Sequence, residues 1–156
     1  MSQELWKDSL RQGLQGSQAH LAPARLLAAD PRQRADQALP GVPYSARGCL
    51  YHTLVWSELL AALVAGERPA WPENLESSWQ VPEDLRTAQG WELMAGRLQD
   101  SIRRATEQLE HVDLAGPVAG WPPATVGRVY QEMIMHNSYH LGQLVVLLRM
   151  AGAWPS

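Results

Sequence analysis

The residues of this chain most able to do chemistry are three histidines on apolar segments, His52, His136 and His140. His136 and His140 are four residues apart, so on a helix their side chains share one face, with about 5–6 Å between Cβ atoms. That spacing allows two imidazoles to bind one divalent ion. His52 lies on a second apolar stripe, one turn before Trp56. Because unpaired imidazoles are costly in a core, a shared metal ion is favoured, and separate hydrogen-bonded core histidines are the alternative.

Two further residues lie one turn from these histidines. Glu132 precedes His136 by four residues, and its carboxylate could orient that histidine, add a weak fourth ligand or lie in solvent at the edge of the stripe. Cys49 precedes His52 by three residues, and a lone half-buried cysteine is more typical of core packing than of metal binding. The chain has this one cysteine, which excludes an intramolecular disulfide framework and a multi-cysteine zinc module.

Helices must hold these residues, because apolar side chains recur at helical spacing through most of the chain. Proline and glycine separate the helical segments, and Ser45 is well placed to cap the segment that carries His52. The acidic pair at 83–84 suits the start of the third segment, and Gly152 suits the C-cap of the last. The predicted helices cover residues 3–20, with a short continuation at 24–29, and then 45–66, 83–111 and 124–150.

We predict an all-α fold, a four-helix bundle that forms a single domain over residues 1–156. No segment alternates apolar and polar residues as a strand would. The length suits one domain, since domains most often have about 100–150 residues. Long connections at 31–44 and 66–82 allow the helices to pack out of sequential order. The second connection is long enough to be unusual without a function, so we expect it to wall a site.

The composition excludes several classes of function. Thirteen Lys and Arg residues oppose sixteen Asp and Glu residues, and the basic ones are scattered, so no nucleic acid is expected as a partner. No apolar stretch approaches the roughly 20 residues that span a bilayer, so no membrane association is expected. The N-terminal segment lacks the basic and apolar regions of a signal peptide. We therefore expect a cytoplasmic protein.

Two segments of the chain resemble a known family. The sequence HNSYHLGQ at 136–143 is similar to the H-x-x-Y-H-x-G-Q signature of the DinB-like (damage-inducible) superfamily of metal-binding four-helix bundles. The Tyr-Ser pair at 44–45, followed by His52 and the aromatic Trp56, resembles the start of that family's second helix. The chain end at 148–155 also looks like the family's usual end. The specific motifs lie in these parts, and the rest of the chain matches in architecture.

The resemblance implies an up-down-down-up bundle with a divalent metal, such as Zn, Ni or Fe, held by His52, His136 and His140 in an open pocket. Three histidine ligands leave a position for water or substrate, as in catalytic sites. Trp56 and Glu132 would lie at this pocket. Gln143 would hydrogen-bond near the site or between helices. Homodimers are frequent in the family, so the resemblance also implies a homodimer.

The resemblance further implies a function, since family members include bacillithiol S-transferases and mycothiol-dependent enzymes. In these, a metal lowers the pKa of a small thiol, which attacks an electrophile as the thiolate. We therefore expect a thiol S-transferase of stress response or detoxification, with Trp71 and Trp79 of the 66–82 connection lining an electrophile pocket. Two alternatives stay open. One is a metal-dependent hydrolase that uses Glu132 as general base, and the other is a non-catalytic bundle stabilised by metal that acts through a partner.

Overall fold

The computed structural model describes residues 3–16, 20–29, 31 and 34–154, and these residues form helices and connections without any β-strand. The all-α prediction is therefore confirmed for this part of the chain. Four long helices form the bundle, and short 3-10 turns lie in its connections. Their bounds are α1 Gln3–Gln15, η1 Pro23–Ala28, α2 Ala46–Val64, η3 Ser77–Trp79, η4 Glu83–Leu85, α3 Ala88–Gln108 and α4 Val126–Met150.

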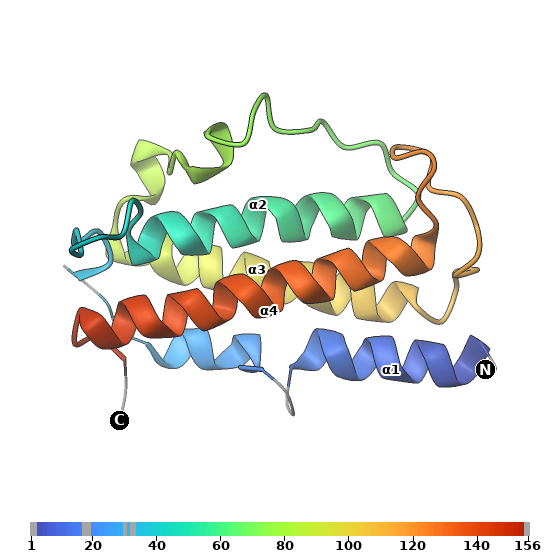
Figure 1. Cartoon of the computed structure of the whole chain (residues 1–156), viewed down its shortest axis with the longest axis horizontal. Coiled ribbons are helices and arrows are strands. Elements are labelled where there is room, and N and C mark those ends of the chain that lie inside the picture. Colours follow the sequence, from blue (N-terminus) through green and yellow to red (C-terminus); the bar gives the residue numbers. More distant parts are fainter. Residues whose placement is uncertain (1–2, 17–19, 30, 32–33, 155–156) are drawn as a thin grey trace.

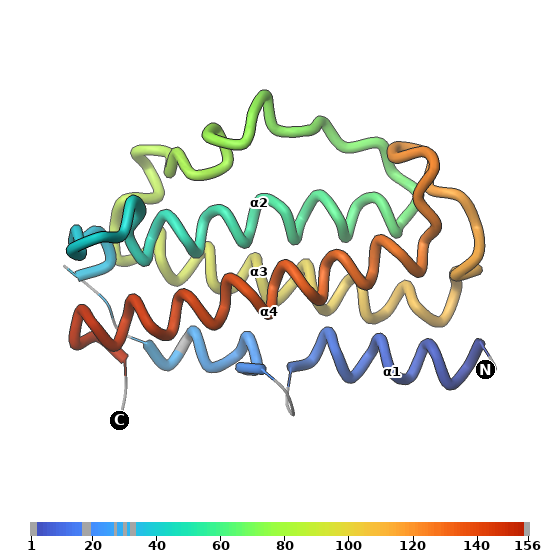
Figure 2. The backbone as a smooth tube through the Cα atoms, viewed as in Figure 1, coloured from blue at the N-terminus to red at the C-terminus, as the bar shows by residue number. Residues whose placement is uncertain are grey.

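The helices run in the predicted up-down-down-up order. In Figure 1, α1 and α4 run in one direction, while α2 and α3 run in the other. The connection at 66–82 makes this possible, because it returns along the whole length of α2 before α3 begins (Figure 2). α2 packs against both α3 and α4, and these two helices also pack against α1. The connection therefore lies directly over the helix that carries His52.

Each of the last three long helices begins at a hydroxyl cap. Ser45 Oγ accepts a hydrogen bond from the Gly48 amide at 3.1 Å, which confirms the predicted cap of α2. Thr87 and Thr125 accept in the same way at the starts of α3 and α4. Gly152 has a φ of +66° just past the end of α4, the left-handed conformation that suits a C-cap glycine.

The predicted start of the third helix at 83–84 is wrong. Those residues form the separate 3-10 turn η4, and α3 begins only after Thr87, which has extended backbone with φ −123° and ψ 171°. Close packing explains the break, because a Cβ on Gly90 would lie 2.3 Å from the Leu85 carbonyl oxygen. Glycine at this position thus lets η4 fold over the first turn of α3.

The first helix is shorter than predicted. α1 ends at Gln15, and Gly16 has a φ of +69°, which stops the helix before the predicted end at 20. Residues 17–19 of that prediction lie outside the described residues. The short helical continuation predicted at 24–29 is present as η1. No helix among the described residues is long and apolar enough to cross a membrane.

Candidate metal centre

The fold brings His52 of α2 together with His136 and His140 of α4. One ligand nitrogen from each ring lies within 4.8 Å of the other two. His52 and His140 are buried, and His136 is half-buried. In the described part of the chain, this cluster of possible metal ligands contains no fourth histidine, cysteine or carboxylate. The two helices therefore present three imidazoles to one point and leave further coordination positions to a ligand.

A serine on the 66–82 connection fixes the tautomer of His52. His52 Nδ1 lies 2.8 Å from Ser78 Oγ, and that hydroxyl donates its own proton to the Leu75 carbonyl at 2.7 Å. Ser78 can therefore only accept from His52, which requires the proton to be on Nδ1. The lone pair of His52 is then on Nε2, the nitrogen that faces the other histidines.

Gln143 does the same for His140. Its Oε1 atom lies 2.8 Å from His140 Nδ1 and accepts a hydrogen bond from it. The lone pair of His140 is thus also on Nε2. Histidines that bind metal usually donate the other ring N–H to a carbonyl or carboxylate in this way, which orients the ring and raises its basicity. His52 on α2 and His140 on α4 are therefore both held in the tautomer that leaves the Nε2 lone pair free to bind a metal.

The distance between the Nε2 atoms of His136 and His52 is the distance expected for two ligands of one metal ion. His136 Nε2 lies 3.3 Å from His52 Nε2. Two imidazole nitrogens bound tetrahedrally to zinc at about 2.0–2.1 Å lie roughly 3.3–3.4 Å from each other. His136 Nδ1 is buried and has no hydrogen-bond partner among the described residues. The donor set of three neutral imidazoles suits borderline divalent ions such as Zn, Ni and Fe, so the residues present fit such a group.

The electrostatic environment keeps the imidazoles neutral. Burial, with help from the two neighbouring histidines, lowers the pKa of His52 to about 3. Burial and His140 lower the pKa of His136 to about 4. Burial also lowers the pKa of His140. Metal binding requires deprotonated imidazole, so the three rings are in the binding form at neutral pH.

Aromatic rings of the connections cover one face of the cluster. The Trp79 ring stacks on the His52 ring, with centroids 3.9 Å apart and an interplanar angle of 11°. Tyr44 stacks in turn on Trp79 at 4.5 Å. The connection at 66–82 thus walls the site, as its length predicts, through η3 and the preceding residues.

The cluster lies at a pocket of about 280 Å³. Trp56 contributes to its wall, and so does Glu132, a half-buried residue whose carboxylate lies 3.6 Å from Arg128 Nε. Apart from Glu132 and the three histidines, the pocket wall is apolar, and among its lining residues none is Lys or Arg. The full lining consists of His52, Trp56, Leu60, Leu75, Trp121, Glu132, His136 and His140.

Neither of the two tryptophans predicted to line an electrophile pocket is among the residues that line this one, and Trp71 lines the larger pocket described below. Trp71 contacts Trp56 and Trp121, with ring centroids 6.0 and 5.5 Å apart, while Trp79 covers His52. Leu75 and Trp121 occupy the wall instead. Sequence reasoning missed both, because they lie in connections without a periodic pattern. The one signal available was a large aromatic residue, Trp121, within a proline-rich turn.

Cys49 belongs to the core. Its side chain is fully buried, and its thiol donates to the His140 carbonyl at 3.5 Å. Burial raises the pKa of Cys49 to about 12, so the thiolate that a metal requires is strongly disfavoured. The cysteine is absent from the cluster of possible ligands in the described chain.

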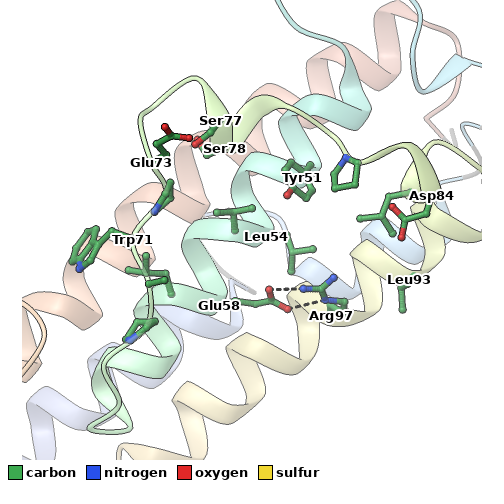
Figure 3. Close-up of a pocket in the computed structure, with 17 residues that line it drawn as sticks. Tyr51, Leu54, Glu58, Trp71, Glu73, Ser77, Ser78, Asp84, Leu93 and Arg97 are labelled. Carbon is green, nitrogen blue, oxygen red and sulfur yellow. Dashed lines mark hydrogen bonds and ion pairs between the residues drawn. The ribbon is translucent and has the colours of Figure 1, made fainter.

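A second pocket of about 800 Å³ lies between the same connection and helices α2 and α3 (Figure 3). Glu58 of α2 and Arg97 of α3 form a bidentate salt bridge. Arg97 Nε donates to Glu58 Oε1 at 2.8 Å, and Arg97 Nη2 donates to Glu58 Oε2 at 2.7 Å. Ser78 lines this pocket as well. The residue that bonds to His52 Nδ1 is thus also part of the wall of the second pocket.

Comparison with known proteins agrees with this geometry. The family model of the DinB superfamily matches residues 8–144, a range that contains all three histidines. A search of curated proteins and a search of solved structures found no match. The family model covers most of the chain, and the chain therefore belongs to the DinB superfamily.

Proposed function

We propose that this protein is a metal-dependent thiol S-transferase that serves stress response or detoxification. The observation that supports the proposal is the convergence of three neutral imidazoles on one point of an apolar pocket. Three protein ligands are typical of catalytic metal sites, because they leave a position for a reactant. His52, His136 and His140 would hold a divalent ion there.

The chemistry divides between the ion and the pocket. When bound, the ion would lower the pKa of a small thiol so that its sulfur reacts as the thiolate. Glu132 is the carboxylate of the pocket wall and would accept the thiol proton. The sulfur would then bond to an electrophilic carbon, and the leaving group would depart with its electron pair. Trp56 and Trp121 would hold the apolar part of the electrophile and exclude water.

The test is a transfer assay on metal-loaded protein with bacillithiol and a chromogenic aryl halide. We expect the reaction to be faster with the wild type than with H136A, and H111A should keep the wild-type rate. His111 is the matched control, since it is an exposed histidine outside the cluster. Equal rates for the wild type and H136A would contradict the proposal and favour a non-catalytic role of the metal.

One observation favours a second candidate, a metal-dependent hydrolase. Glu132 lines the same pocket as the three histidines, and a carboxylate in that place could act as general base toward water. A chromogenic ester offered without any thiol would separate the two functions. Hydrolysis that is lost in E132Q would support the hydrolase, and no hydrolysis by the loaded wild type would exclude it for that ester.

A further inference from the structure

The connection at 66–82 encloses the second pocket against α2 and α3 (Figure 3). Its volume of about 800 Å³ lies within the range of about 300–1,000 Å³ that is usual for sites of small organic molecules. None of the residues that line it also lines the pocket of the histidine cluster. The metal-dependent chemistry proposed above makes no use of it, so the second pocket is a separate candidate site.

The roof of the second pocket has a defined structure of its own. Pro69, Pro72 and Pro82 lie in the wall, and the ring of each proline fixes its backbone φ. Between them, Asn74 Oδ1 accepts a hydrogen bond from the Ser77 amide at 2.8 Å, and the Ser77 hydroxyl donates to the Asn74 carbonyl at 2.7 Å. A roof held in this way costs a ligand little ordering entropy when it binds.

The floor of the second pocket is mainly apolar. α2 contributes Leu54, Val55 and Leu59, and α3 contributes Leu93, whose side chain is 53% exposed. Tyr51 of α2 adds an aromatic ring. A ligand that covers this floor gains from burying apolar surface, so it needs an apolar body.

The charged groups of the wall favour a cation. Arg97 is the one cationic residue of the lining, and its Nε and Nη2 atoms already donate to Glu58. Glu73 and Asp84 also line the pocket, and neither carboxylate has a partner among the residues that the structure describes. Figure 3 shows these two carboxylates at opposite ends of the pocket, with Tyr51 between them. The charge left without a partner is therefore negative, and it repels an anionic ligand.

We propose that the second pocket binds an organic cation with an apolar body, such as an aryl-alkyl amine. The apolar body would lie on the floor formed by α2 and α3, and the ammonium group would lie beside Glu73 or Asp84. The Tyr51 ring would add a cation–π contact. The site contains no histidine or cysteine and needs no metal ion, so the cation should also bind to the metal-free protein.

Three probes that share one apolar body and differ in charge test the proposal. They are 4-phenylbutylamine, 4-phenylbutanol and 4-phenylbutyrate, each titrated into chelator-treated protein and followed by two-dimensional NMR. The chelator prevents the amine from binding through a metal ion. We expect the amine to bind with a dissociation constant of roughly 0.1–2 mM, as suits its small size. It should bind at least about fivefold more tightly than the alcohol, and the carboxylate should bind most weakly. No binding of the amine, or equal affinities for the three probes, would overturn the proposal.

Charge-removing variants locate the site. E73Q/D84N should bind the amine and the alcohol equally, within about twofold, because both unpaired carboxylates are gone. E76Q/E92Q is the matched control, since it also removes two exposed carboxylates but neither of them lines the pocket, and it should keep the preference for the amine. An equal loss of preference in both double variants would show an effect of net charge alone and overturn the proposal. A loss in E132Q, with none in E73Q/D84N, would place the amine at the histidine cluster and also overturn it.

Discussion

The chemistry of the metal centre depends on which nitrogen of each imidazole carries the proton. Ser78 and Gln143 both accept from an Nδ1 atom, and this leaves the Nε2 lone pairs of His52 and His140 free. Ser78 can only accept, because its own proton is used on the Leu75 carbonyl. Two residues outside the cluster thus orient two of its three ligands.

The orienting role of Ser78 gives a prediction at the residue scale. S78A should weaken metal binding by about 10–100-fold, as loss of a hydrogen bond to a ligand histidine typically does. S77A is a close control, since the Ser77 hydroxyl is exposed and bonds to the Asn74 carbonyl. Competition with a chromophoric chelator measures both affinities. Equal affinities for the two variants would show that Ser78 does not orient His52.

The lowered pKa values of His52 and His136, about 3 and about 4, predict how the metal-free protein responds to acid. In the unfolded chain these histidines have pKa values near 6.5, so below that pH the unfolded state binds more protons than the folded state. The free energy of unfolding should therefore fall as the pH drops from about 6.5 toward 4, and these residues should contribute no pH dependence above about 7. Urea denaturation at a series of pH values, in the presence of a chelator, measures the free energy of unfolding of the metal-free protein.

The control for this prediction removes one of the titrating groups. H136N should lose less stability between about pH 6.5 and 5 than the wild type, because one histidine with a lowered pKa is absent. The range stops at pH 5 so that carboxylates contribute little. An equally steep loss in H136N would mean that His136 is not neutral in the folded protein.

At the scale of elements, the helices that carry the histidines could be predicted and the start of α3 could not. Ser45 caps α2 as its hydroxyl suggests, because a capping bond is local to one turn. The acidic residues at 83–84 suit a helix start equally well by local rules. The helix does not start at 83–84, because Gly90 packs against the Leu85 carbonyl and η4 folds over the first turn of α3. Such a contact between two elements leaves no local signal in the sequence.

One buried arginine joins the elements around the start of α2. Arg47 is 2% exposed and donates to Asp36 and to the carbonyls of Leu85 and Thr87. R47A should lower the free energy of unfolding by about 3 kcal/mol or more, since it leaves buried acceptors unpaired. R103A, which removes an exposed arginine, should change it by less than about 1 kcal/mol. Similar midpoints for the two variants in urea denaturation would contradict this role.

At the scale of the whole molecule, the ligands of the site and the involvement of the connection at 66–82 could be predicted, but the residues of the connections that face the site could not. His136 and His140 share a helix face through their spacing alone. Ser78, Leu75 and Trp121 come from connections, whose course depends on how the helices pack. The up-down-down-up order forces the connection at 66–82 to return over α2 (Figure 1), and this path places Ser78 and Trp79 against His52.

The central claim is that His52, His136 and His140 together hold a divalent ion. Plasma mass spectrometry of the purified protein, beside the double variant H136A/H140A, tests it most directly. We predict about one equivalent of Zn, Ni or Fe per chain in the wild type, and none in the variant, because one imidazole alone cannot retain the ion. A wild type that contains no metal and takes up none when it is added would contradict the claim, as would equal metal content in both proteins.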